Sequence, residues 1–280
     1  MEKAIRRYLP IFVVPTFAAF VIGFIVPFAM GIWLSLCNFT TVTDATFTGL
    51  ENYALALQDT IFQHAFWFTA LFTVVSLVVI NLIAFALALG LTKRLRGTNV
   101  FRTIFFMPNL IGGIVLGYIW QLIFNGILAG YSQALALNQW YGFVGLVILV
   151  SWQQIGYMMI IYIAGLQAIP TDVMEAAQVD GASSWRRLRG VIIPMMMPAI
   201  TICTFLSVTN GFKLFDQNLS LTAGAPAKLS EMLALNIYNT FYGRTGWEGV
   251  GQAKAVIFFI LVVAIGLIQL RATRSKEVQQ

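Results

Sequence analysis

The stretch PTDVMEAAQVDGASSWRRLRGVIIP, residues 170–194, is compact and charged, whereas strongly apolar runs lie on both sides of it. The chain of 280 residues is 59% hydrophobic and only 10% charged. A soluble globular domain has about 25% charged residues, with which it covers its surface. The composition therefore predicts a polytopic membrane protein, in which residues 170–194 form a loop outside the membrane.

Six apolar segments approach or exceed the roughly 20 helical residues that cross a bilayer core. We predict an all-α fold with six transmembrane helices in a single domain of residues 1–280, the spans being about 9–37, 64–92, 103–127, 143–166, 191–216 and 250–270. Pro15 and Pro27 are expected to kink the first span. Lys213, Asp216 and Lys254 are expected at span ends, where charged side chains can reach the interface.

Most Lys and Arg residues fall on one side of this six-span arrangement. The thirteen on that side, out of seventeen, are Lys3, Arg6, Arg7, Lys93, Arg94, Arg96, Arg102, Arg186, Arg187, Arg189, Arg271, Arg274 and Lys276. By the positive-inside rule this side is cytoplasmic, and both termini lie there. The net charge of +6 is thus a topology signal, and a nucleic-acid partner is not expected.

The sequence offers no residues arranged for catalysis or for holding a cofactor. Its one histidine, His64, lies at the edge of the second span, and no Cys/His cluster has metal-ligand spacing. No GxxxxGK[ST] phosphate-binding pattern occurs, so this chain is not expected to hydrolyse ATP. An ion-coupled carrier needs ionisable groups at membrane depth, for which Lys213 and Asp216 are the candidates. Three residues apart on one expected helix face, they can also pair with each other.

One loop on the opposite side of the membrane has helical character. Residues 229–243, LSEMLALNIYNTFYG, are expected to form a helix capped by Ser230. Its apolar stripe comprises Met232, Leu233, Ile237, Tyr238 and Phe241. The stripe can pack on the membrane half of its own chain or dock an external partner, and both interpretations stay open.

The local signals within residues 170–194 predict a short helix lying across the spans. Pro170 ends the fourth span, Thr171 can cap a new helix, and Gly181 suits the left-handed residue that closes it. The helix would have about nine residues and a length of roughly 13 Å. Ser183 or Ser184 can cap a second short segment. Small side chains on the first helix let another protein approach closely, so it is either a docking element or an idle surface helix.

This stretch resembles the EAA loop of the permease subunits of ATP-binding-cassette importers. The matching residues are Glu175, Ala176, Ala177, Asp180, Gly181 and Ala182, followed by Ile192 or Ile193 and by Pro194 or Pro198. LQAIP at 166–170, FDQNLSLTAGAP at 215–226 and the six-span layout are similar to the carbohydrate branch of that family, the multiple-sugar or raffinose kind related to maltose-type permeases. The resemblance covers nearly the whole chain.

The resemblance implies that residues 170–194 form a coupling loop whose helix sits in a cleft of a separate ATPase. The coupling residues would be Glu175, Ala176, Ala177, Asp180, Gly181 and Ala182. The carboxylates would make polar contacts with the ATPase, the alanines would allow close approach, and the glycine would make the turn. Closure of the ATPase dimer would move this helix as a rigid body and switch the access of the spans.

The resemblance also implies partners and a location. A second permease subunit, forming a heterodimer, two ATPases that bind ATP and Mg²⁺, and an extracellular or periplasmic solute-binding protein would complete the importer. This chain would bind no cofactor itself. It would lie in a bacterial inner or plasma membrane, in contact with lipid.

The family's substrate path corresponds to residues of the fourth span and the end of the fifth. The matching positions are Gln153, Gln154, Tyr157, Asn210, Gly211, Lys213 and Leu214. Amides suit sugar hydroxyls and an aromatic ring can stack on a sugar face, although each polar residue can also serve only as an interhelical hydrogen-bond partner. The expected cargo is an oligosaccharide. A glycerol-phosphate importer is the alternative within the family, and it would need more cationic residues than Lys213.

Overall fold

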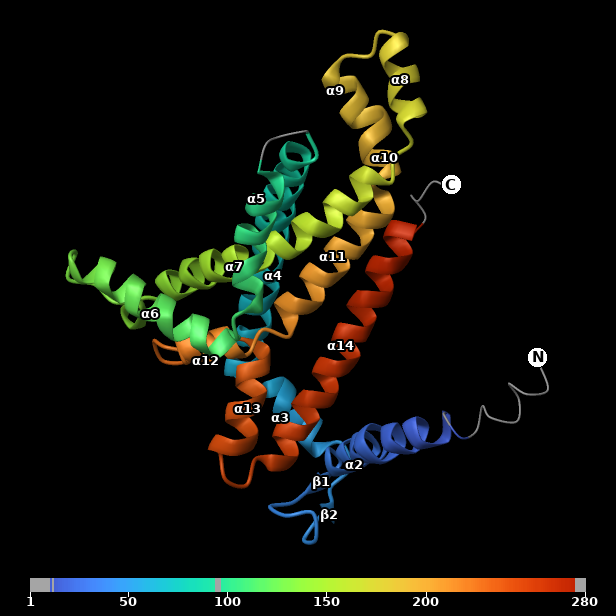
Figure 1. The fold of residues 1–280 in the computed structure, drawn as a ribbon. Coiled ribbons are helices and arrows are strands. Elements are labelled where there is room, and N and C mark those ends of the chain that lie inside the picture. The colour runs from blue at the N-terminus through green and yellow to red at the C-terminus, as the bar shows by residue number, and fades with distance from the viewer. Residues whose placement is uncertain (1–10, 12, 94–96, 275–280) are drawn as a thin grey trace. The chain divides into compact units, whose positions relative to one another are not determined.

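The computed structural model describes residues 11, 13–93 and 97–274, with side chains as far as Ala272. The described residues are mostly helical, with one two-stranded hairpin (Figure 1). They belong to two compact units, one of Met1–Thr60 with Ile237–Ile260 and the other of Ile61–Asn236 with Leu261–Gln280. Part of the predicted topology signal lies outside the described residues, namely Lys3, Arg6, Arg7, Arg94, Arg96, Lys276 and the side chain of Arg274.

The first unit begins with a helix over Val13–Leu34, which ends three residues before the predicted span does. Within it a π-helical turn, η1 (Val21–Ile25), precedes α2 (Val26–Leu34). The N–H of Val26 donates to the carbonyl of Val21, one residue further back than in an α-helix. Pro27 follows directly and has no N–H, and local π turns are one way in which membrane helices accommodate a proline. The irregularity expected at Pro27 takes this form.

The first unit continues with β1 (Cys37–Asn38), β2 (Thr46–Phe47) and α3 (Glu51–Gln58). In the loop between the strands, the carboxylate of Asp44 accepts hydrogen bonds from the backbone N–H groups of Thr41, at 2.9 Å, and Thr40, at 3.0 Å. These two donors hold the pKa of Asp44 below its ordinary value of 3.8, and the hydrogen bond from Thr41 has the larger effect. The carboxylate therefore stabilises the loop at neutral pH, and this contribution is lost as the pH falls through the lowered pKa.

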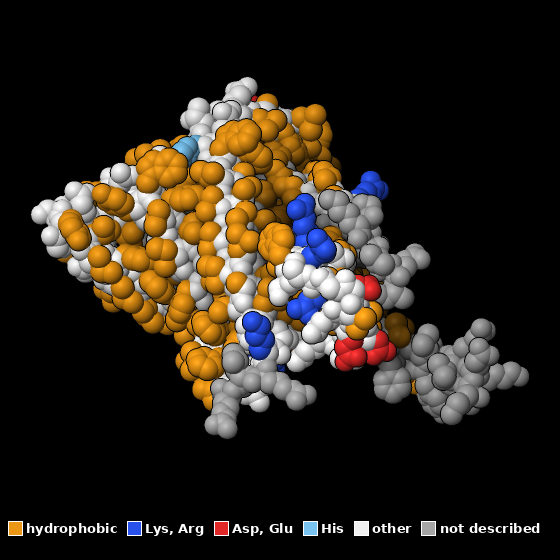
Figure 2. Space-filling model, turned by 90° about the horizontal axis from the view of Figure 1, so that it is seen from above, with side chains coloured by type: hydrophobic (Ala, Val, Ile, Leu, Met, Phe, Trp, Pro, Cys, Tyr) orange, Lys and Arg blue, Asp and Glu red, His pale blue; other side chains and the backbone are white. Residues whose placement is uncertain are grey.

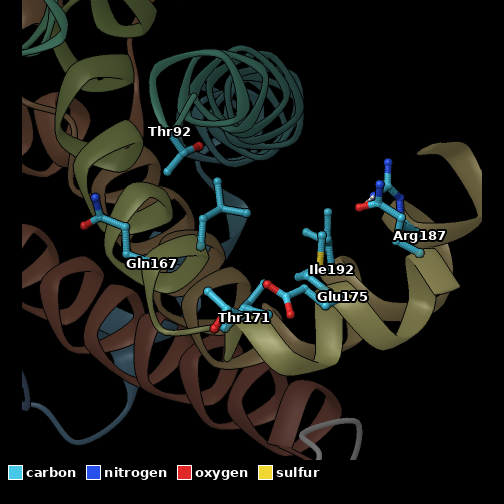
Figure 3. A pocket seen from close by; sticks show the side chains of 10 residues that line it. Thr92, Gln167, Thr171, Glu175, Arg187 and Ile192 are labelled. Carbon is cyan, nitrogen blue, oxygen red and sulfur yellow. Dashed lines mark hydrogen bonds between the residues drawn. The ribbon is translucent and has the colours of Figure 1, made fainter. Parts of the chain in front are cut away.

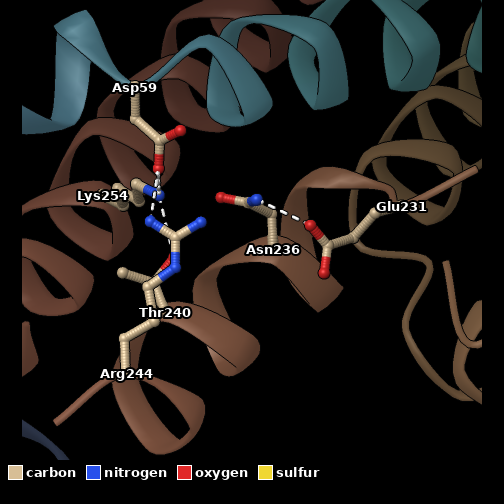
Figure 4. Close-up of polar contacts among 6 residues, drawn as sticks. All are labelled: Asp59, Glu231, Asn236, Thr240, Arg244 and Lys254. Atoms are coloured by element: carbon tan, nitrogen blue, oxygen red, sulfur yellow. Dashed lines mark hydrogen bonds and ion pairs between the residues drawn. The ribbon is translucent and has the colours of Figure 1, made fainter. Parts of the chain in front are cut away.

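The sequence predicts that Lys254 lies at a span end, where its side chain reaches the interface. This prediction is wrong, because Lys254 is fully buried in the first unit. It belongs to α14 (Glu248–Arg274), and its Nζ lies 2.8 Å from Oδ2 of Asp59, which follows α3. The same ammonium donates to Oγ1 of Thr240 at 2.8 Å, and Nη1 of Arg244 lies 3.2 Å from the same carboxylate oxygen (Figure 4). The carboxylate neutralises the ammonium, which is what allows a lysine to be buried at all.

The second unit holds most of the length of two continuous spans. The predicted spans at 64–92 and 143–166 appear as α4 (Thr60–Leu91) and α7 (Gln139–Gln167). The sixth predicted span appears as α14, which passes from one unit into the other. With the N-terminal helix, these make four described helices long and apolar enough to cross a membrane.

The third and fifth predicted spans are not single straight helices. The third consists of α5 (Thr98–Phe106), η2 (Met107–Leu110) and α6 (Gly113–Ala129), which bend by 99°. The fifth consists of α9 (Ser184–Arg187), η4 (Leu188–Ile192), α10 (Ile193–Met195) and α11 (Met197–Phe212), which bend by 70°. Pro108 and Pro198 lie at the two bends, where a missing N–H interrupts the helical bonding. If each bent pair is one span, the described chain has six.

Lys213 and Asp216 do not share a helix face, contrary to the sequence-based expectation. Lys213 follows the last residue of α11, and Asp216 begins the separate helix α12 (Asp216–Leu221). Within the described residues they form no ion pair, and both side chains are exposed. A self-neutralising pair inside one helix is therefore excluded by the helix break between them.

The helix expected over 229–243 begins four residues later, as α13 (Leu233–Gly243). Ser230 does not cap it, because its hydroxyl donates to the carbonyl of Ala225 at 2.6 Å. The backbone N–H groups of Met232 and Leu233 instead donate to Oδ1 of Asn218 and Oγ1 of Thr69, each at 2.9 Å. Of the predicted stripe, Met232 and Leu233 are buried and Ile237 and Phe241 are half-buried, whereas Tyr238 is exposed.

Close backbone packing positions α12 against α6 within the second unit. A Cβ added to Gly113 would lie 2.7 Å from Cβ of Asp216, and one added to Gly117 would overlap the side chain of Ser220. Only glycine permits this approach, as at other small-residue interfaces of membrane helices. The short helix η3 (Leu135–Leu137) completes the unit, whose apolar core is formed mainly by α4, α7 and α11.

Candidate functional site

Residues 170–194 contain a helical hairpin that begins at the end of α7 (Figure 1). Its first helix, α8 (Thr171–Val179), has the nine residues predicted. Thr171 does not cap it, because Pro170 occupies the cap position and the Thr171 hydroxyl donates to Asp172 at 3.4 Å. Gly181 closes the helix with φ of 72°, as predicted. The N–H groups of Gly181 and Ala182 donate to the carbonyls of Gln178 and Ala177, which is the Schellman pattern.

The second arm of the hairpin is α9, and polar bonds join it to the first. Of the two predicted caps, Ser183 is the one used, since its Oγ accepts from the N–H of Arg186 at 3.4 Å. The guanidinium of Arg187 donates to Oε1 of Gln178 on α8 and to Oγ of Ser184, both at 3.4 Å. The hairpin is therefore a small structured element and not an irregular loop.

The hairpin presents a mixed surface. Glu175, Ala176, Asp180 and Gly181 are exposed, while Ala177 and Ala182 are half-buried. The small-residue face predicted for α8 is thus only partly free. Two large apolar side chains that the sequence analysis did not single out are also exposed, Val179 at 87% and Trp185 at 68%. Charged side chains gather in one region of the face seen in Figure 2, and apolar side chains cover most of the rest.

A cavity of about 500 Å³ separates the hairpin from the ends of α4 and α7 (Figure 3). Glu175 and Arg187 line it from the two arms of the hairpin, and Thr92 and Gln167 line it from the spans. Glu175 therefore has one side toward the chain's own cavity.

A second pocket, of about 260 Å³, lies where α7, α11 and α12 meet. It is lined by Gln154, Asn210, Lys213, Leu214, Phe215, Asp216 and Gln217. Four of the seven predicted path residues are therefore brought together there, namely Gln154, Asn210, Lys213 and Leu214. The amide of Asn210 donates to Oε1 of Gln154 at 3.5 Å, so the two amides present one polar edge to the pocket.

The other three predicted path residues have other surroundings. Gln153 donates to the carbonyl of Ile111 at 3.2 Å and accepts from Gln217 at 2.7 Å, so it joins helices, as the alternative interpretation held. Gly211 packs against α4, where an added Cβ would lie 2.6 Å from Oγ1 of Thr73. Tyr157 packs against the apolar core.

Phe215 and Gln217 also line the pocket, although neither is among the predicted path residues. Both belong to FDQNLSLTAGAP at 215–226, a segment that carries part of the resemblance. The signal was therefore present, but the expected continuation of the fifth span to residue 216 hid the turn that points these side chains into the pocket.

Residues 82–275 match the family described as the binding-protein-dependent transport system inner membrane component. The chain belongs to this family. The matched segment contains both the hairpin and the pocket at Gln154 and Asn210. The prediction of an all-α permease subunit is confirmed, and members of this family are membrane components of transport systems.

Curated relatives of this permease align over nearly their whole length. The probable starch degradation products transport system permease protein of Thermoanaerobacterium thermosulfurigenes is 43% identical over 96% of this chain and 94% of its own. The trehalose/maltose transport system permease protein of Thermococcus litoralis is 28% identical over 95% of this chain and 93% of its own. Among solved structures, a chain of a bacterial transporter that imports the acidic polysaccharide alginate superposes with a TM-score of 0.82 at 18% identity, covering 98% of both chains. This likeness shows that the two permease folds agree.

Proposed function

We propose that this permease carries a sugar, of oligosaccharide size, into the cytoplasm in an ATP-binding-cassette importer driven by a separate ATPase. The observation that carries the proposal is the pocket whose edge is formed by the amides of Gln154, Asn210 and Gln217. Amides donate and accept hydrogen bonds at once, as sugar hydroxyls require. The relatives whose names mention starch degradation products and trehalose or maltose support the same cargo class.

The charges of the pocket favour a neutral cargo over a phosphorylated one. Lys213 is the one cation among its lining residues, and Asp216 on the same wall offsets it. A doubly charged phosphate needs a surplus of cationic donors. Glycerol-phosphate permeases are among the relatives, at 30% identity, but this pocket lacks such a surplus. Membership of a binding-protein-dependent family disfavours a carrier that works alone on an ion gradient.

The hairpin is proposed to face the cytoplasm and to dock on the ATPase. Arg186 and Arg189 on it are exposed, as are Lys93 and Arg271 at the corresponding ends of α4 and α14, and a cluster of basic residues marks the cytoplasmic side. Both termini would then be cytoplasmic. Exposed Val179 and Trp185 add apolar area to the carboxylates of Glu175 and Asp180, and aromatic side chains are frequent anchors of protein interfaces.

The complete importer is proposed to contain a second, different permease subunit, two ATPases and an external binding protein. One solved relative of similar fold is an alginate transporter in complex with a periplasmic protein that holds a pentasaccharide. ATP and Mg²⁺ would be bound by the ATPases. The part that falls to this chain is to convert movement of α8 into movement of α7 and α11, to which the hairpin is connected at its two ends.

Reversing the charge of Glu175 on α8, or adding a side chain at Gly181 in the turn of the hairpin, is expected to uncouple sugar uptake from ATP hydrolysis. Glu175→Lys and Gly181→Asp should reduce sugar uptake into proteoliposomes by about tenfold or more, the factor that about 1.4 kcal/mol of lost docking energy gives. Glu175 is exposed, and no atom lies within 4 Å of the position of a Cβ at Gly181, so insertion and folding should persist. Uptake and ATP hydrolysis are measured on the same complex with radiolabelled maltotriose and the cognate binding protein.

The matched control for the hairpin test is Gly246→Asp. Gly246 also has a positive φ, of 81°, and open space around its Cβ, but it lies outside the hairpin. Its aspartate variant should carry the same backbone strain and keep normal uptake. Normal uptake in both hairpin variants would contradict the coupling role.

Two substitutions in the pocket separate a neutral from an anionic cargo. Asn210→Leu should lower the rate of oligosaccharide uptake by about tenfold, because it removes an amide that pairs with hydroxyls and leaves that of Gln154 unpaired. Lys213→Met should change the rate by less than about threefold, since an exposed cation contributes little to binding an uncharged sugar. The opposite order of effects would indicate an anionic cargo.

A further inference from the structure

One amide inside the second unit joins three helices. The side chain of Asn81, on α4, donates to the hydroxyl of Ser207 on α11 at 2.9 Å and to the carbonyl of Leu77 at 2.8 Å. Its Oδ1 accepts the phenolic O–H of Tyr162, on α7, at 2.7 Å. Both donor hydrogens and one acceptor position are therefore used, and α4, α7 and α11 meet at a single side chain.

This polar node, Asn81 with Tyr162 and Ser207, borders the apolar core, to which Tyr162 belongs, and Asn81 itself is half-buried. Tyr162 and Ser207 are each 2% exposed, and the ring of Phe85 packs edge-on against Tyr162 at 5.5 Å between centroids. In such surroundings an unpaired amide or hydroxyl is costly, so a fully bonded set fixes the relative register of its helices. Uncharged polar side chains in membrane spans commonly join neighbouring helices, and at this node one amide joins three of them.

The node occupies a defined place between the two candidate sites. The chain leads from α7 directly into α8, and from α9 through the 70° bend into α11, so both ends of the hairpin are attached to helices of the node. Toward the other end, α7 and α11 carry Gln154 and Asn210, which line the solute pocket. Gln154 lies eight residues from Tyr162 along α7, about 12 Å at the helical rise.

Helix α4 also extends from the node toward the hairpin. Thr92, directly after its last residue, lines the cavity beneath α8, although α4 has no chain connection to the hairpin. The hydrogen bonds of the node add directional contacts to the packing of α4, α7 and α11. A pull on α8 is therefore expected to move the three helices together.

We propose that Asn81 is a positioning residue for transport, which locks α4, α7 and α11 into one body so that movement of residues 170–194 reaches the pocket at Gln154 and Asn210. This proposal rests on the coupling role proposed above for the hairpin. Asn81 lines neither the pocket at Gln154 and Asn210 nor the cavity beneath α8. Its effect is on how much of the movement of the hairpin arrives at the pocket.

The test is the number of ATP molecules hydrolysed for each sugar molecule imported. Tyr162→Phe and Ser207→Ala each delete one oxygen from the node and should raise this ratio by about threefold to tenfold, which lies within the roughly 0.5–2 kcal/mol, or about twofold to thirtyfold, typical of residues between two coupled sites. Asn81→Leu should raise it at least as much. The amount of assembled complex, measured by size-exclusion chromatography, should stay near that of the parent for the two single-oxygen variants.

The matched control is Thr204→Val, which removes an interhelical bond of the same kind elsewhere on α11. The hydroxyl of Thr204 accepts from Gln269 of α14 at 2.9 Å, outside the node. A merely structural role predicts that this variant and Tyr162→Phe behave alike, whereas the proposal predicts an altered ratio only for the latter. Tyr162→Phe should also add nothing in an Asn81→Leu background, because both act through one amide.

Unchanged ratios in Tyr162→Phe and Ser207→Ala would overturn the proposal, and these two variants decide the matter if Asn81→Leu does not assemble. Glu175→Lys and Gly181→Asp show which hypothesis has failed. If they uncouple transport while the node variants do not, the node is structural and the hairpin keeps its role. If the hairpin variants also behave as the parent, the proposed function of the hairpin fails first.

Discussion

Asp59→Leu is expected to destabilise the first unit by about 3–5 kcal/mol, because it takes the Asp59 carboxylate away from a fully buried ammonium. Lys254 is 0% exposed, and its Nζ lies 2.8 Å from the Asp59 carboxylate (Figure 4). The hydroxyl of Thr240 remains as an acceptor but carries no charge. The loss is measured as the thermal unfolding midpoint of the purified protein in detergent, and as its yield in the membrane.

A double substitution separates the pair itself from its burial. Asp59→Leu combined with Lys254→Met replaces both charges by apolar groups of similar volume, and such replacements are often nearly neutral. Arg244 can tolerate the change, since its side chain is 25% exposed and can turn to water. The double variant should therefore recover most of the stability lost in Asp59→Leu. If it is as unstable as the single variant, the ion pair is not what Asp59 provides.

Asp44→Asn is a matched surface variant, and comparing its loss of stability with that of Asp59→Leu shows how much burial contributes. Asp44→Asn changes a carboxylate that also accepts two hydrogen bonds, from Thr40 and Thr41, but the loop is exposed to solvent. An exposed carboxylate contributes little in comparison with a buried one. Its variant should unfold close to the parent, and an equal loss in the two variants would contradict the importance of burial at Asp59.

The pair of Asp59 and Lys254 also shows where sequence reasoning stops. Composition and apolar length identified the spans, because the demand of a bilayer for about 20 apolar residues is local and strict. The partner of a lysine 195 residues away is not local information. A charge at the edge of an apolar run was therefore assigned to the interface, the default for an isolated charged side chain, although the chain supplies a carboxylate that permits its burial.

The bends in the third and fifth spans also depend on contacts that are distant in the sequence. Pro108 and Pro198 were visible in the sequence, yet proline in a membrane helix produces anything from a π turn, as before Pro27, to a bend of 99°. Which of these occurs depends on what satisfies the freed carbonyls. At the third span, Gln153 of α7 donates to the carbonyl of Ile111 at the break, a contact between residues 42 positions apart.

The hairpin was predictable in more detail because its signals are short-range. Gly181 and Ser183 fix its turns through bonds to neighbours within five residues. The pocket was predictable in part, since Gln154 and Asn210 were assigned to it through the resemblance alone. Phe215 and Gln217 were missed because their direction is set by the start of α12, which in turn packs on the glycines of α6.

Gly156→Leu is expected to separate α5 from α7 and to destabilise the second unit by about 3 kcal/mol or more. A Cβ at Gly156 would overlap the carbonyl of Phe105 and lie 2.8 Å from Cα of Phe106. Overpacking costs typically about 1–3 kcal/mol when side chains can shift, and here the obstacle is backbone, which cannot turn away. Gly156→Ala should already be destabilising for the same reason.

Gly90→Ala in α4 is the matched control, because no atom lies within 4 Å of the position of its Cβ. There the loss of backbone freedom in the unfolded chain should stabilise the helix by about 0.5–1 kcal/mol. The same substitution in two helices of one unit is thus expected to have opposite signs, read as opposite shifts of the unfolding midpoint. Equal shifts would mean that α5 and α7 do not pack through backbone contact. The half of α7 that carries Gln153 and Gln154 would then lack the support on which the geometry of the pocket depends.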